Sequence, residues 1–273
     1  MTKKRFFLVI ALFFLTCSGL FAGYYTKGDF SFVTKLSMFG LNQAVGYKGV
    51  SLLEDRDTIF WLFGGAKINN RGYYRYADED NYDEHEDSYS DFQYLATNLI
   101  WGAGISQGLI DDARKDTDLL YFSIFYKGVR EWYEEDNDKY FFQSDRSDRH
   151  GLLQNSVVLE VAFDNVLVDK ETGMKQGVFS NATFEYAPEF FFNDCYGESD
   201  FRKYYATLKI FVPIYEFSED KPFSSFYFGN STSLDYVTGD DISIYARQYL
   251  GSTSCFSGLG GFVRGYESHR FDS

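Results

Sequence analysis

A two-residue alternation of apolar and polar side chains is the feature that most limits how this chain can fold. It is clear at residues 120–126, 157–164 and 206–215, and weaker near 29–39, 58–66, 91–104, 177–192 and 223–236. Side chains along a strand point alternately to the two faces of a sheet, whereas a helix repeats about every 3.6 residues. No window after residue 22 sustains the helical spacing. The alternation therefore predicts an all-β, antiparallel fold.

The same alternation fits two architectures, a soluble β-sandwich and a transmembrane β-barrel. Strands of about 10 residues favour the barrel because they match a tilted membrane strand. Aromatic residues make up 21% of the chain and gather in short runs at the ends of predicted strands, at residues 24–25, 73–74, 140–142, 190–192 and 204–205. Membrane barrels concentrate aromatic side chains at the lipid–water boundary. The sequence thus predicts an antiparallel transmembrane β-barrel, with the sandwich as the alternative.

The N-terminus predicts export. Three basic residues precede an apolar run at residues 6–15, and small residues follow as far as Ala22. Signal peptides have this order, and about ten apolar residues are too few to span a bilayer comfortably. We therefore expect residues 1–22 to be a signal peptide and residues 23–273 to form one outer-membrane barrel domain. An uncleaved anchor is one alternative; a lipoprotein at Cys17 is another, although the small residue usual before such a cysteine is missing.

The balance of charge excludes one class of function. The chain has 26 Lys and Arg against 40 Asp and Glu, a net charge of −14. Cleavage after Ala22 removes three basic residues and no acidic ones, so the net charge becomes −17. Proteins that bind nucleic acid are normally basic, and we expect no nucleic acid among the partners. Acidic stretches at residues 78–87, 134–138 and 145–150 predict exposed loops.

Motifs of enzymes and metal sites are not found in the sequence. The three histidines are not spaced as zinc ligands, and neither a Gly-x-Ser-x-Gly elbow nor a glycine-rich phosphate loop occurs. The acidic run at residues 78–87 suggests a calcium site but lacks the spacing of an EF-hand. We therefore expect no enzymatic activity, no cofactor and no bound metal.

The most specific string lies near the C-terminus. Residues 258–268 read Gly-Leu-Gly-Gly-Phe-Val-Arg-Gly-Tyr-Glu-Ser, which resembles the sixth outer loop of the BamA/TamA superfamily of outer-membrane barrels. The motif positions are Gly260, Gly261, Val263, Arg264, Gly265 and Tyr266. Upstream, the Asp164-Asn165 turn between two predicted strands resembles the central strands of that family. The resemblance implies a barrel of roughly sixteen strands, and the residues before Gly258 suffice for about eleven or twelve of them.

The resemblance also implies a role for this loop inside the barrel. Arg264 would extend its guanidinium to a carboxylate of the inner wall, Gly265 would permit a close turn, and Tyr266 would pack against the wall. The candidate acidic partners are Glu160, Asp164 and Glu185. The alternative is an ordinary arginine in a surface loop.

Two cysteines follow the signal peptide, Cys195 and Cys255. An exported chain meets an oxidising compartment, so the two thiols either form a disulfide or stay free.

The resemblance implies a role in inserting or translocating proteins at the outer membrane, with lipid and unfolded or translocated proteins as partners. The sequence departs from the family because it ends at Ser273, seven residues after Tyr266, and leaves no room for periplasmic domains before the first strand. Unpaired strand edges are costly in lipid. We expect a C-terminally incomplete barrel, completed by another chain or copy, or closed at a smaller size. A passive porin-like barrel and a soluble exported β-sandwich that binds a surface partner are the alternatives.

Overall fold

The computed structural model describes residues 23–27, 30–37, 40–48, 51–53, 56–74, 93–114, 118–169, 174–216, 225–246, 249–250 and 269–270. Most of these residues are in strands, and helix is limited to short turns such as α2 (Tyr140–Gln143). None of the helices in these ranges has the length and apolar character needed to cross a membrane.

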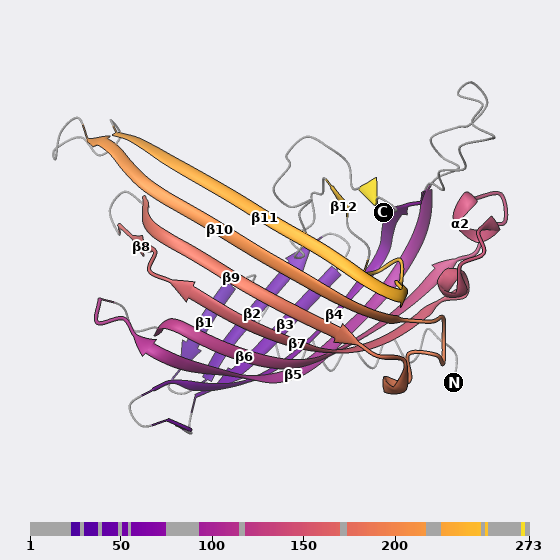
Figure 1. Cartoon of the computed structure of the whole chain (residues 1–273), viewed down its shortest axis with the longest axis horizontal. Coiled ribbons are helices and arrows are strands. Elements are labelled where there is room, and N and C mark those ends of the chain that lie inside the picture. The colour runs from indigo at the N-terminus through magenta and orange to yellow at the C-terminus, as the bar shows by residue number, and fades with distance from the viewer. Residues whose placement is uncertain are drawn as a thin grey trace.

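The described strands form one large antiparallel sheet and a small separate ladder (Figure 1). Ten strands of the sheet lie side by side in chain order, and β8 pairs only with β9. The sheet contains β1 (Gly23–Lys27), β2 (Phe30–Ser37), β3 (Gly40–Tyr47), β4 (Thr58–Tyr73), β5 (Gln93–Asp111), β6 (Asp118–Glu134), β7 (Leu152–Asp164), β8 (Leu167–Val168), β9 (Lys175–Ala187), β10 (Asp200–Glu216) and β11 (Ser225–Asp241). The ladder pairs β12 (Tyr249–Leu250) with β13 (His269–Arg270). The prediction of an antiparallel all-β fold is confirmed.

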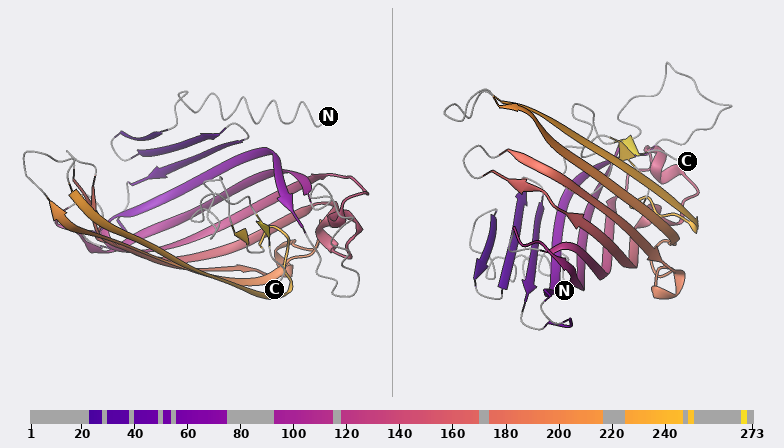
Figure 2. Two further views of the ribbon diagram at one scale, coloured as in Figure 1. Left: turned by 90° about the horizontal axis from the view of Figure 1, so that it is seen from above. Right: turned by 60° about the vertical axis from the view of Figure 1, so that its left-hand side comes forward.

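The sheet curls into a trough. Figure 2 shows its strands curving around a hollow side on which β12 and β13 lie, and β13 comes close to β4. We call the hollow side the concave face and the opposite side the outer face. Within the described residues, β1 and β11 are the two edges of the sheet and do not pair with each other. The barrel wall is therefore not closed in this part of the chain.

Connections between the strands lie alternately at two ends of the sheet. Those after β4, β6, β9 and β11 are at one end, on the right in Figure 1, which we call the loop end. Those after β3, β5, β7 and β10 are at the other end, the turn end. The two longest connections between strands of the large sheet, residues 74–92 and 135–151, are both at the loop end. Long connections at one end and short ones at the other are typical of membrane barrels.

Strand register brings the apolar side of each strand onto the outer face. Val161 of β7 pairs with Ala182 of β9, which pairs in turn with Ala206 of β10. Large apolar side chains are exposed on this face from β4 to β11; Leu62 is 65% exposed and Leu234 is 69% exposed. An outer face of this kind agrees with the alternation predicted from the sequence.

The predicted strand segments all correspond to observed strands, with three corrections. Strands β1 and β3 and the two-residue strands β8, β12 and β13 were not predicted. The prediction of a strand as far as residue 192 is wrong, because β9 ends at Ala187 and Pro188 leads into a 3₁₀ turn. The aromatic run at residues 140–142 does not end a strand either; it belongs to α2, where Phe141 and Phe142 are buried.

Glycines on the concave face allow aromatic rings of neighbouring strands to pack close against the sheet. Gly102 and Gly104 are both on β5, and the rings of Phe63 and Phe125 lie over them. A Cβ atom at Gly104 would overlap the Phe125 ring and the backbone carbonyl of Ile124. The backbone cannot move aside as a flexible side chain would, so the strand spacing here depends on glycine.

Replacing Gly104 by Val should therefore lower the free energy of unfolding by about 1–3 kcal/mol, the usual cost of overpacking. Urea titration of the protein in detergent micelles measures this change. The matched control is Ala103→Val, because Ala103 directly precedes Gly104 in the chain and is exposed on the outer face. We expect the control to change the stability by less than about 0.5 kcal/mol. Equal losses for the two variants would contradict the assignment of the faces.

Candidate functional site

A row of charged side chains crosses the concave face from β6 to β11. Lys127 Nζ lies 2.6 Å from Oε1 of Glu185, and the Ser156 hydroxyl donates to the same oxygen at 2.7 Å. Lys203 is next to Glu185 in register, and its Nζ lies 3.1 Å from Oδ2 of Asp235. None of these side chains is more than 19% exposed. We call these five residues the charge row.

The formal charges of this row cancel, because it contains two lysines and two carboxylates. Charges persist away from water when they are paired and hydrogen-bonded. Each ion pair also joins different strands, Lys127 of β6 to Glu185 of β9 and Lys203 of β10 to Asp235 of β11. The charge row therefore braces the wall across the direction of the strands.

The residues after β11 fold back over the charge row. Lys203 Nζ donates to the carbonyl of Ala246 at 3.1 Å, and the Ser243 hydroxyl donates to Oε1 of Gln154 on β7 at 2.6 Å. Ser243 is fully buried and Ala246 is 4% exposed. We call residues 242–246 the plug segment. Its contacts with β7 and β10 hold it against the concave face at the loop end.

A buried ion pair in the connection between β6 and β7 holds the plug segment from another side. Nε and Nη2 of Arg146 each donate to one carboxylate oxygen of Asp148 at 2.8 Å. Arg146 Nη2 also donates to the carbonyl of Ile242 at 2.9 Å, and the Ile244 N–H donates to Asp148 Oδ2 at 2.5 Å. Burial alone would lower the pKa of Arg146, but the charge of Asp148 and its hydrogen bonds raise that pKa overall. The guanidinium stays charged, and we call this pair the clamp.

An aromatic cluster packs against the plug segment. Ile244 is fully buried among aromatic side chains that include Phe141 of α2. The Phe141 ring is stacked on Tyr94 of β5, with centroids 4.4 Å apart, and lies edge-on to Tyr133 of β6 at 4.9 Å. Tyr74, which follows β4, lies edge-on to it at 5.7 Å. The plug segment thus connects β4, β5 and β6 with β7 and β10 on the concave face, at the loop end.

The three predicted acidic partners lie on β7 and β9, and the structure does not bring them together. Glu185 belongs to the charge row. Glu160 of β7 accepts a hydrogen bond from Nδ2 of Asn181 on β9 at 3.1 Å. Asp164 is the last residue of β7, and its Oδ1 accepts the N–H of Val166 at 2.9 Å. A contact of any of these carboxylates with the loop arginine stays a prediction.

The loop motif lies outside the described residues, so the role of Arg264 stays a prediction. Gly260, Gly261, Val263, Gly265 and Tyr266 are outside them too. The backbone on both sides is described. Tyr249 pairs with Arg270 and Leu250 pairs with His269, and Figure 2 shows this ladder on the concave side.

The choice between a disulfide and free thiols stays open, because Cys255 is outside the described residues. Cys195 is exposed in the connection between β9 and β10 and is not bonded to another described cysteine. The acidic run at residues 78–87 is not described either. In the part of the chain that is described, no group of three or more His, Cys, Asp and Glu side chains could hold a metal ion.

The clamp and the plug segment were not predicted from the sequence. Residues 145–150 were expected to form an exposed acidic loop, and this expectation is wrong for Asp148, which is 1% exposed. The error has a physical cause, because the plug segment that covers Asp148 comes from a part of the chain almost 100 residues away.

Comparisons with known proteins identify the fold and no more. No family model and no curated protein matches the sequence. The crystal structure of BamA from Haemophilus ducreyi lacking POTRA domains 1–3 is similar, with a TM-score of 0.52 and 8% sequence identity. The similarity covers 88% of this chain and 40% of that BamA chain. The described sheet is therefore the wall of a BamA-like β-barrel.

Proposed function

We propose that this chain is an outer-membrane β-barrel protein that takes part in the insertion or translocation of other proteins and is not a passive pore. One observation carries the proposal: the outer face is apolar and exposed, while the charges of the charge row are paired and partly covered by the plug segment. The BamA-like fold and the resemblance of residues 258–268 to the loop signature support it.

Aromatic side chains at both ends of the outer face support contact with lipid. At the loop end, the Tyr204 ring lies 5.1 Å from Phe184 and 6.2 Å from Tyr236 between centroids. At the turn end, Phe30 and Tyr47 lie 4.8 Å apart. Aromatic rings favour the two lipid–water boundaries, and the apolar belt between them would face the hydrocarbon.

The plug segment argues against passive diffusion through the barrel. A water-filled channel would leave polar side chains on the inner wall free to meet solutes. Here the lysines and carboxylates of the charge row bind one another, and Lys203 also binds the plug segment. The proposal requires that further strands cover the edges of β1 and β11, from this chain, another copy or a partner, since unpaired backbone groups cost several kcal/mol each in lipid.

Gel migration and conductance test the barrel and the covering of its concave face by the plug segment. We expect the unheated protein in detergent to migrate differently from the heated protein, because a folded barrel resists the gel detergent. In planar bilayers we expect no steady open conductance. A large, stable conductance would favour the porin-like alternative. A protein that is soluble without detergent and migrates at one position would favour the exported sandwich.

A kinetic experiment tests the role in insertion. Liposomes that contain this protein should speed the folding of an unfolded outer-membrane barrel protein added from urea, compared with liposomes of the same lipid alone. Folding is followed by the same heat-dependent gel shift. An equal rate in both liposomes would contradict the insertion role, while the assignment as a membrane barrel would stand.

A further inference from the structure

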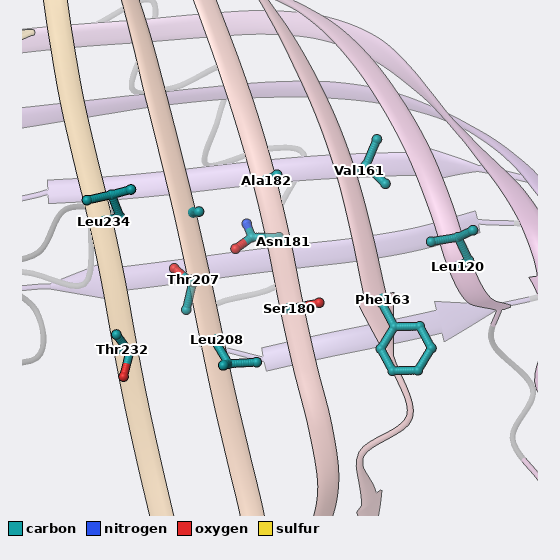
Figure 3. A pocket seen from close by; sticks show the side chains of 11 residues that line it. Leu120, Val161, Phe163, Ser180, Asn181, Ala182, Thr207, Leu208, Thr232 and Leu234 are labelled. Atoms are coloured by element: carbon teal, nitrogen blue, oxygen red, sulfur yellow. The ribbon is translucent and has the colours of Figure 1, made fainter.

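Small side chains leave a groove in the middle of the outer face (Figure 3). Ser180 and Ala182 of β9 lie in it, with larger side chains such as Phe163 and Leu234 at its sides, and Ala206 of β10 also lines it. The groove has a volume of about 520 Å³ and a mostly apolar lining. We call it the outer groove.

Different chemical groups follow one another along β10 from the outer groove to the loop end. Ala206 lies in the groove, and Tyr204, the next outward-facing residue, is 46% exposed. Arg202 comes next, is exposed, and holds its guanidinium 5.6 Å from the centre of the Tyr186 ring. A strand advances about 3.3 Å per residue, so Arg202 is about 13 Å along the strand from Ala206. From the middle of the outer face to the loop end, the groups are therefore an apolar groove, an aromatic ring and a cation.

We propose that the outer groove binds a phospholipid, with an acyl chain against Ala182 and Ala206 and the phosphate at Arg202. The inference rests on the proposed function, because a bilayer supplies the lipid to this face. A guanidinium matches a phosphate through two parallel hydrogen bonds. Among the described residues Arg202 contacts an aromatic ring and forms no ion pair, which leaves its donors for the phosphate. The aromatic row that includes Tyr204 marks the depth at which headgroup and chain separate.

Nearby carboxylates narrow the class of headgroup. Asp200 and Asp241 pair in register at the ends of β10 and β11, two residues from Arg202 along β10. A headgroup with a second negative charge would be repelled there, whereas an ammonium group would be attracted. The ligand is therefore a zwitterionic phospholipid of the phosphatidylethanolamine type.

Native mass spectrometry of the full chain in detergent micelles tests the site. The probes are dioctanoyl phosphatidylethanolamine, dioctanoylglycerol with the same chains and no phosphate, and inorganic phosphate. The variants are Arg202→Gln, which removes the charge, and Ala206→Phe, which fills the groove. The control is Ala103→Phe, a similar enlargement of an exposed alanine on β5 of the same outer face.

We expect the phospholipid to bind the unaltered protein at least tenfold more tightly than dioctanoylglycerol, and inorganic phosphate not to displace it. Arg202→Gln and Ala206→Phe should each weaken binding at least tenfold, and Ala103→Phe should not. Equal binding of the two lipids, displacement by phosphate, or full binding to either site variant would overturn the inference. Heat-dependent migration of the same samples separates the two proposals: if the shift is present and lipid specificity is absent, only the lipid site fails.

Discussion

Replacing Asp148 by Ala should lower the free energy of unfolding by about 3–5 kcal/mol, the cost of leaving a buried charge without its partner. Arg146 would keep its charge while its side chain stays 12% exposed. The Ile244 N–H would also lose its acceptor, so the plug segment should come loose. Urea titration measures the stability, and hydrogen exchange at the Ile244 amide, expected to rise at least tenfold, reports the plug segment.

The matched control is Asp112→Ala at the turn end. Asp112 forms the same two-bond contact with Arg114, at 2.8 and 2.9 Å, and the two residues are also two positions apart. The Arg114 side chain is 52% exposed, so water can replace the lost partner. We expect a smaller loss than for Asp148→Ala and unchanged exchange at Ile244. If the two variants lose equal stability, burial does not set the strength of the clamp.

Breaking the charge row from one side should cost more than removing both partners of a pair. Glu185→Leu would leave Lys127 without the carboxylate that lies 2.6 Å from its ammonium, and we expect a loss of about 3 kcal/mol. Adding Lys127→Met to the same protein should recover part of this loss, because the uncompensated charge is removed. Urea titrations of the two single variants and the double variant give the coupling energy, expected to be about 2 kcal/mol.

The exposed pair of Lys48 and Asp57 at the turn end provides the control cycle. Its atoms lie 2.5 Å apart, as close as those of the charge row, but the two side chains are 48% and 30% exposed. Water screens such a pair, so its coupling should be below about 1 kcal/mol. Equal coupling in the two cycles would show that the charge row is solvated and does not brace the wall.

A strand can be predicted from the sequence where its two faces differ strongly in polarity. In β6, β7 and β10 the outward positions are apolar, so the period is visible. Strand β3 shows no clear alternation. Gln43 interrupts its apolar outward side, and its inward side has small residues such as Gly40, Ala44 and Gly46. Gly46 is small for a reason in the neighbouring strand, since the Trp61 ring lies over it. A pattern within one strand carries no information about such a partner.

The site is less visible in the sequence than the fold. The clamp joins residues of the β6–β7 connection to the plug segment, 96 positions along the chain. A local pattern could not have found it, because the sequence has Arg and Asp two positions apart five times. Arg146 and Asp148 are buried at the loop end, whereas Arg114 is exposed at the turn end. Only the packing of distant segments separates the two cases.

Spin-label accessibility along β10 tests the central claim that the outer face meets lipid and the concave face does not. Nitroxides are placed one at a time at residues 206–212 in a variant with its native cysteines replaced, and the protein is folded into liposomes. Labels at Ala206, Leu208, Ile210 and Val212 should collide with dissolved oxygen, which concentrates in lipid. Labels at Thr207, Lys209 and Phe211 should not, so the signal should alternate with a period of two residues. A uniform signal, or strong access of a water-soluble nickel reagent at the first set, would contradict the account.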